Sequence, residues 1–116
     1  MVSARELLEK KSRHQETALN DAEIKEHLAA VDGWTLQDGK LSKAFSFKNY
    51  YETLAFVNAI AYLIHAEDHH PELSVTYNRC IVKFNTHSVN GGRGGISEND
   101  FICAAKVDAV FRHKAA

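Results

Sequence analysis

The stretch His65-Ala-Glu-Asp-His-His-Pro71 closes a long apolar segment, and the other predicted elements lie on either side of it. The segment before it, residues 50–66, contains few polar side chains. Pro71 is the only proline of the chain, and a proline disfavours helical backbone at the residue before it. We therefore expect one long helix from residue 50 that ends near residue 68 or 69.

Apolar side chains cover most of the circumference of this expected helix. Those of residues 50–66 include Tyr50, Tyr51, Leu54, Phe56, Val57, Ile60, Tyr62, Leu63 and Ile64. A helix of this kind is buried on more than one side. One side can face the sheet of so small a domain, so we expect the other side to contact a second subunit.

The upstream sequence predicts a helix over residues 21–31, with Asn20-Asp21 as its N-cap, followed by a β-hairpin. Asp38-Gly39 is typical of a tight turn, here between strands 34–36 and 41–47. The second strand alternates apolar and polar residues, which indicates one buried face. Residues 1–19 are mostly polar, and we expect a mobile arm or a short helix there, before a single domain spanning residues 20–116.

The downstream sequence predicts a strand pair and a last helix. The strands cover residues 73–77 and 80–87, and a glycine-rich loop occupies residues 91–95. Ser97-Glu-Asn-Asp100 is an acidic variant of the capping box and opens a helix that ends near residue 112. The order of elements predicts an α+β fold, with a four-stranded antiparallel sheet and three helices packed on one face.

Composition excludes several classes of partner. The 116 residues carry a formal net charge of −1, whereas a nucleic-acid or anionic-membrane surface requires a basic excess. No apolar run approaches the roughly 20 residues that span a bilayer. The two cysteines form no C-x-x-C pair, which fits a reducing, cytoplasmic environment.

Four of the seven histidines fall between residues 65 and 87, beside carboxylates. His65 and His69 share a helix face, and the strand that ends at His87 returns along the same sheet. Three interpretations remain open: surface histidines at a helix end, a metal site, or general acid–base catalysis. Against a metal site, the full H-E-x-x-H motif is absent and the adjacent His69-His70 pair cannot easily aim both rings at one ion.

Metal-free acid–base chemistry suits imidazoles, because histidine both gives and takes a proton near neutral pH. Dehydration of a carbinolamine, for example, requires an acid on the leaving hydroxyl and a base on the neighbouring N–H. Each role typically contributes roughly 10²–10⁴-fold in rate.

These residues resemble the signature of the pterin-4a-carbinolamine dehydratases. The elements that match, in order, are His-x-x-x-His-His-Pro at 65–71, Tyr77, Thr86-His87 and Asp100. The resemblance extends from about residue 34 to residue 110. It implies a hydro-lyase that converts 4a-hydroxytetrahydropterin to quinonoid dihydropterin without a metal or organic cofactor. It also implies a homodimer or homotetramer that recycles the pterin of aromatic amino acid hydroxylases such as phenylalanine hydroxylase.

The resemblance implies site residues by position. The catalytic histidines are His69, His70 and His87, and the implied substrate-binding residues are His65, Asp68, Pro71, Asn85, Thr86, Ser88 and Asp100. This chain has His65 where many family members carry glutamate, so Glu67 is a candidate to supply that carboxylate. The loop at residues 90–95 is also longer and richer in glycine than is usual.

A non-catalytic alternative has the same fold. Animal members of the family also act as dimerisation partners of a homeodomain transcription factor, which makes a transcriptional co-regulator module the second hypothesis. A pure interaction module has no need of a histidine trio, so we favour the enzyme.

Overall fold

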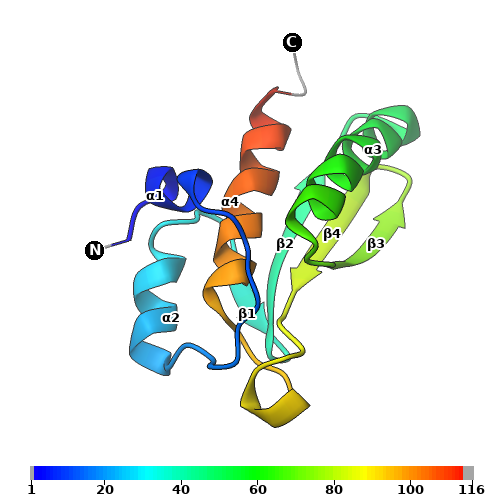
Figure 1. Cartoon of the computed structure of the whole chain (residues 1–116). Helices are drawn as coiled ribbons and strands as arrows, with labels where there is room; N and C mark the ends of the chain where they lie inside the picture. The colour runs from blue at the N-terminus through cyan, green and yellow to red at the C-terminus, as the bar shows by residue number, and fades with distance from the viewer. Residues whose placement is uncertain (1, 114–116) are drawn as a thin grey trace.

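The computed structural model describes residues 2–113, and in that range it contains four α-helices, one short 3-10 helix and one sheet (Figure 1). In chain order the elements are α1 (Ala4–Glu9), α2 (Asp21–Leu28), β1 (Thr35–Gln37), β2 (Lys40–Ser46), α3 (Tyr50–Glu67), β3 (Glu72–Thr76), β4 (Arg79–Phe84), η1 (Asn90–Gly92) and α4 (Glu98–His113). The predicted α+β class is confirmed.

The four strands form one antiparallel sheet in the order β1-β2-β4-β3. β2 and β4 are central, with Leu41 opposite Phe84 and Phe45 opposite Cys80. β1 and β3 are the two edges. The order follows from two hairpins whose second strands, β2 and β4, lie side by side.

The hydrophobic core lies between one face of the sheet and helices α3 and α4. Phe45 of β2 lies at its centre, 1% exposed, with its ring centroid 4.9 Å from those of Phe56 and Phe111. Val82 and Phe84 of β4 are buried on the same face, as the alternation of the sequence predicts. Helix α1 packs against α4 and buries Leu7 completely.

Local signals set the ends of α3. The Asn49 side chain accepts a hydrogen bond from the Glu52 amide and caps the first turn. The C-cap is Asp68 in the left-handed conformation, with φ of 51°, three residues before Pro71. The expected end of the long helix is therefore confirmed, and the chain turns sharply just before His69 and His70.

Strand β4 ends earlier than residue 87, where the sequence pattern placed its end. Beyond Phe84 neither neighbouring strand continues, because the last pairs are Leu41 with Phe84 and Glu72 with Lys83. Thr86 instead exchanges backbone hydrogen bonds with Gly95 across the glycine-rich loop. Buried and half-buried positions still alternate through Thr86, as they do along β4.

Within residues 2–113, none of the helices combines the length and apolar character that crossing a lipid bilayer requires.

Replacement of Phe45 tests the position of the core. Phe45→Ala removes a fully buried ring that contacts three other aromatic side chains, those of Trp34, Phe56 and Phe111, so it should lower the free energy of unfolding by about 3–5 kcal/mol. Chemical denaturation measures this change. Ser46→Ala, one residue further along the same strand and exposed, is the matched control and should change stability by less than about 0.5 kcal/mol. Equal effects of the two substitutions would contradict the assigned core.

Candidate active site

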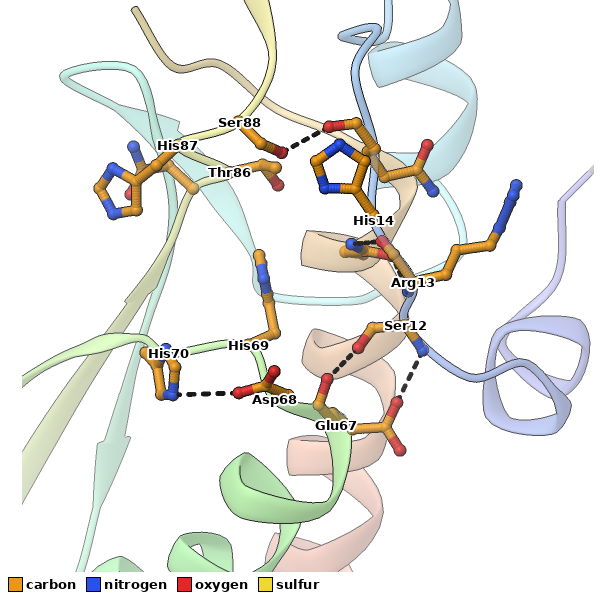
Figure 2. A pocket seen from close by; sticks show the side chains of 13 residues that line it. Ser12, Arg13, His14, Glu67, Asp68, His69, His70, Thr86, His87 and Ser88 are labelled. Carbon is orange, nitrogen blue, oxygen red and sulfur yellow. Dashed lines mark hydrogen bonds and ion pairs between the residues drawn. The ribbon is translucent and has the colours of Figure 1, made fainter. Parts of the chain in front are cut away.

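A cavity of about 410 Å³ opens where the end of α3, the end of β4 and the start of α4 meet (Figure 2). Its size is within the range of small-molecule sites. Seven of the residues singled out from the sequence line it: Asp68, His69, His70, Asn85, Thr86, His87 and Ser88. The fold therefore brings together two groups of residues that are separated in sequence by the whole of β3 and β4.

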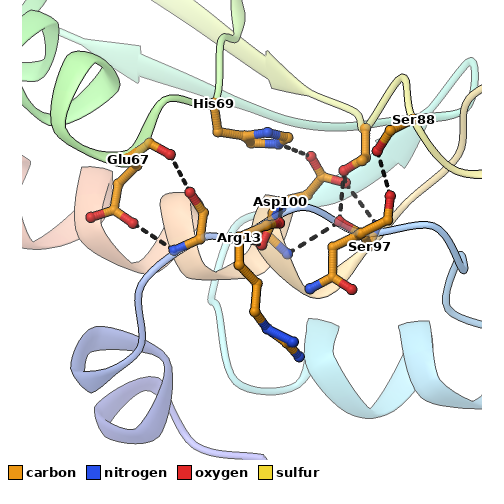
Figure 3. A network of polar contacts seen from close by, with 10 residues as sticks. Arg13, Glu67, His69, Ser88, Ser97 and Asp100 are labelled. Carbon is orange, nitrogen blue, oxygen red and sulfur yellow. Dashed lines mark hydrogen bonds and ion pairs between the residues drawn. The ribbon is translucent and has the colours of Figure 1, made fainter.

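His69 is the most constrained histidine of the cavity. Its side chain is only 12% exposed, and its ring stacks on Phe84 with the centroids 5.8 Å apart. Its Nε2 lies 2.6 Å from Oδ1 of Asp100, at the start of α4 (Figure 3). Stacking and hydrogen bonding together hold the ring in one orientation.

Asp100 is completely buried, and it joins three segments of the chain. Its Oδ2 accepts hydrogen bonds from the Thr86 hydroxyl and from the Ser97 amide, both at 2.9 Å. The Ser97 hydroxyl accepts from the Asn99 amide, one residue before the position that a full capping box uses, so the Asp100 half of the predicted capping box is present. A carboxylate in the first turn also lies at the positive end of the helix dipole.

Asp100 also selects the tautomer of His69. An ionised carboxylate can only accept hydrogen bonds, so the proton between the two side chains lies on Nε2 of His69. The neutral ring then carries an unprotonated Nδ1. In catalytic triads a carboxylate likewise orients the histidine, although there it accepts from Nδ1 and leaves Nε2 free.

The side chains of His70 and His87 are more exposed to solvent than that of His69. His70 is 75% exposed, and its Nε2 lies 3.6 Å from Oδ1 of the exposed Asp68. His87 follows the end of β4 and is also exposed. Figure 2 shows these two rings and that of His69 around the same opening. The cavity thus has one oriented imidazole and two that can reach a ligand directly.

Three residues proposed from the sequence do not line the cavity. His65 is exposed in the last turn of α3, and Pro71 is half-buried at the exit from the turn. Asp100 lies behind His69, which it contacts directly. The cavity also has lining residues outside the site residues implied by the resemblance: Ser12, Arg13, His14, Gln15, Asn99 and Glu67, the last proposed from the sequence only as a substitute carboxylate. Most of these come from the polar N-terminal segment, where no periodicity or spacing signals a site.

Glu67 is buried and already paired. Its two carboxylate oxygens accept from the Ser12 amide and from Lys106 Nζ, each at 2.8 Å. Burial raises the pKa of the Glu67 carboxyl, but the hydrogen bonds from Lys106 and Ser12 outweigh burial and bring the pKa below its ordinary value. The stability contributed by these contacts is therefore present above the ordinary carboxyl range and is lost as the pH falls through the lowered pKa. Glu67 is held by protein groups rather than presented to a ligand.

The cysteines do not suit nucleophilic chemistry. Burial, together with the charges of Glu67 and Asp100, raises the pKa of Cys103 to about 12, and burial also raises the pKa of Cys80. The thiolate is the reactive form, so both thiols are inert near neutral pH. In the part of the chain that the structure describes, no group of three or more histidine, cysteine or acidic side chains is arranged to hold a metal ion.

Comparison with known proteins places the chain in a family. A family model described as pterin 4 alpha carbinolamine dehydratase matches residues 17–110. A protein of Bdellovibrio bacteriovorus named "Putative pterin-4-alpha-carbinolamine dehydratase" is 64% identical over 110 residues, covering 95% of this chain and 92% of the relative. A protein with the same name from Nitrosospira multiformis is 51% identical over 94 residues, covering 81% and 80%.

A solved structure has the same fold. The transcriptional coactivator/pterin dehydratase from Brucella melitensis aligns with a TM-score of 0.73 at 34% identity, over 81% of this chain and 98% of that one. The similarity to this structure therefore extends over most of the chain.

Replacement of Asp100 tests the tautomer of His69. In Asp100→Asn the new amide can donate to Nε2, so the ring proton should move to Nδ1 in the majority of molecules. Nitrogen NMR chemical shifts of the imidazole report the change, and circular dichroism checks the fold. Asp68→Asn removes an exposed carboxylate from the same cavity and should leave the His69 shifts unchanged. Unaltered His69 shifts in a folded Asp100→Asn protein would contradict the assignment.

Proposed function

Because this chain belongs to the pterin 4 alpha carbinolamine dehydratase family, we propose that it removes water from a 4a-hydroxytetrahydropterin to give the quinonoid dihydropterin. The expected family is confirmed, and with it the assignment of the chain as a hydro-lyase. The histidine mechanism and the metabolic role that follow are our proposal.

One observation carries the mechanism: three of the four imidazoles that line the cavity, those of His69, His70 and His87, come from two different segments, and a buried carboxylate orients one of them. Loss of water from the carbinolamine requires a proton donor at the hydroxyl on C4a and an acceptor for the proton on N5. The two sites are on adjacent atoms, so the donor and the acceptor must lie close together. Adjacent histidines at the end of a helix meet that requirement.

In the proposed reaction, His69 and His70 divide the two proton transfers between them. One imidazolium protonates the leaving hydroxyl and the C4a–O bond breaks, while the N5 electrons form the C4a–N5 double bond. The other imidazole takes the N5 proton, and water leaves. His87 completes the proton network, and transfer between the rings restores the starting protonation states, so the reaction consumes no other reactant.

The remaining residues bind the substrate or position other groups of the site. We assign substrate contacts to Asp68, Asn85 and Ser88, whose positions line the cavity. The Thr86 hydroxyl and both its backbone groups are already hydrogen-bonded within the protein, so we give Thr86, like Asp100, a positioning role. Pro71 directs the chain out of the helix, and His65, outside the lining, can act only indirectly.

The proposed role is recycling of the pterin cofactor of aromatic amino acid hydroxylases, with no metal or organic cofactor in the dehydration itself. The second hypothesis, a co-regulator module of the same fold, requires none of the cavity geometry. The oriented His69–Asp100 pair supports the enzyme, because an interaction module gains nothing from a fixed imidazole tautomer.

Replacement of the exposed histidines tests the mechanism. His70→Ala and His87→Ala should each lower turnover of 4a-hydroxytetrahydropterin by about tenfold or more, because each removes a proton-transfer group. Stopped-flow absorbance measures the rate, and thermal unfolding checks the fold. A plot of the rate of the unaltered enzyme against pH should rise and fall between about pH 5 and 9, the range of imidazole chemistry.

Rates like those of the unaltered enzyme in both variants would exclude this mechanism. A rate that falls to background after exhaustive chelation, and returns with added metal, would instead support the metalloenzyme hypothesis.

We further propose that the protein forms a homodimer or homotetramer through one face of α3 and the neighbouring edge strand β3. Exposed apolar side chains gather there, with Tyr51 81% and Tyr62 78% exposed on α3. Tyr77, just after β3, stacks on Tyr50 with centroids 6.4 Å apart and is itself 64% exposed. Contiguous apolar surface of this kind, beside an unpaired strand edge, is typical of protein–protein contacts.

Charged substitutions test the association. Tyr62→Glu introduces a charge into the proposed interface and should shift the assembly to monomer at micromolar concentration in sedimentation velocity. Lys25→Glu on the exposed side of α2 is the control and should leave the mass unchanged. A monomeric unaltered protein at that concentration would contradict the proposal.

A further inference from the structure

The N-terminal segment forms a wall of the cavity, although it precedes the part of the chain that the family model matches. The matched region begins at residue 17, whereas Ser12, Arg13, His14 and Gln15 line the cavity together with the catalytic histidines. Figure 2 shows this segment running along the side of the opening that faces Thr86 and Ser88. We call residues 12–15 the N-terminal wall.

Hydrogen bonds attach the N-terminal wall to the three segments that build the site. At α3, the Ser12 amide donates to Glu67 Oε1 at 2.8 Å and the Ser12 hydroxyl donates to the Glu67 carbonyl. At α4, the Arg13 amide donates to Asn99 Oδ1 at 3.1 Å, and the Asn99 side-chain amide donates back to the Arg13 carbonyl (Figure 3). After β4, the Ser88 hydroxyl donates to the Gln15 carbonyl.

The segment is also held on both sides of the wall. Before it, Leu7 of α1 is completely buried against α4, and Lys10 forms a 2.7 Å ion pair with Glu98. After it, the Leu19 amide donates to the Ile96 carbonyl at 2.8 Å. An extended segment fixed at both ends and in the middle has a defined position relative to the cavity.

The His14 ring and the Gln15 side-chain amide are the groups of this wall available to a ligand, and His14 is the exposed one: Gln15 Nε2 is buried without a hydrogen-bond partner among the described residues. The attachments use the backbone of Arg13 and Gln15 and both the backbone and hydroxyl of Ser12, and none of them uses the His14 ring. The ring is 71% exposed, and its ion-pair distance to the exposed Glu16 is a long 3.9 Å. In Figure 2 the His14 ring lies on the cavity side of the segment, whereas the Arg13 side chain points away.

We propose that the N-terminal wall is part of the substrate site and that His14 is a substrate-binding residue. This inference rests on the proposed dehydratase function. An imidazole can hydrogen-bond to a pterin heteroatom or stack on its flat ring. Small-molecule sites usually bury most of their ligand. The N-terminal wall covers a side of the cavity that the histidines following α3 and β4 leave open.

The alternative is that the segment is a strap that serves stability alone. The two possibilities differ in what the His14 ring does, because a strap depends on the backbone contacts and not on that ring. Removal of the ring therefore separates binding from stability.

Steady-state kinetics of His14→Ala provide the first test. KM for the carbinolamine should rise by about two- to tenfold, as expected for loss of one hydrogen bond or stacking contact, with turnover within about twofold of the unaltered enzyme. The dissociation constant for dihydrobiopterin, a stable probe, should rise by the same factor. His14→Gln keeps a hydrogen-bonding group and should recover part of the affinity.

Thr17→Ala, an exposed position on the same segment, is the matched control and should leave KM, affinity and thermal stability unchanged. KM and dihydrobiopterin affinity in His14→Ala equal to those of the unaltered protein would overturn the assignment of His14.

Limited proteolysis provides a test that does not depend on catalysis. Trypsin cleaves after arginine and lysine, so Arg13 reports directly on the wall. Saturating dihydrobiopterin should slow cleavage at Arg13 severalfold in the unaltered protein and less in His14→Ala. Cleavage at the same rate with and without the probe would overturn the proposed wall.

The two proposals fail in different ways. An inactive protein whose wall is still protected by dihydrobiopterin, in a manner that depends on His14, would overturn the dehydratase function and keep the binding wall. An active enzyme without protection and without a His14 effect would overturn only the wall. Failure of dihydrobiopterin to bind to a folded but inactive protein would overturn both.

Discussion

The buried carboxylate of Asp100 is the constraint on which the site depends. A charged group without solvent contact is costly unless its hydrogen bonds are satisfied, and Asp100 has three partners, on three segments. To satisfy it, the turn after α3, the end of β4 and the start of α4 must meet at one point. The meeting of these segments places His69 and brings His70 and His87 to the same opening.

A rigid scaffold supports this arrangement, and the residues that contact a ligand are at its ends. The sheet and α3 hold their positions through the aromatic core around Phe45, while the left-handed Asp68 and the following Pro71 turn the chain toward the cavity. Functional groups placed on short segments that leave rigid elements are oriented without being buried. Neighbouring residues on such a segment can differ in exposure: His69 is nearly buried, and His70 is largely exposed.

The role of Glu67 in the structure differs from the role that the sequence suggests. In the sequence it is a carboxylate near the histidines and a candidate to orient a ligand. In the structure its oxygens accept from Lys106 and from the Ser12 amide, so it joins α4 and the N-terminal wall to the end of α3. Its contribution to the site is to position the chain, and the side chain that this positioning offers to a ligand is His14.

The sequence by itself determined the element order, the antiparallel sheet and the end of α3, because these follow from local signals. Examples are the alternation in β2, the Asp38-Gly39 turn and the proline after His70. It also singled out His69, His70 and His87 as candidate site residues, because their motif is compact. It placed the end of β4 at residue 87, since alternation continues through Thr86 although no strand remains to pair with it.

Tertiary structure alone decided which polar residues share the cavity. The attachment of the N-terminal wall uses mostly backbone groups, which every residue possesses, so no residue type in the segment predicts the attachment. The pairing of Glu67 and the contact of Asp100 with His69 join residues more than thirty positions apart, which no local pattern encodes. Short-range patterns determine helices and strands, whereas the environment of a charged group depends on what the completed fold packs against it.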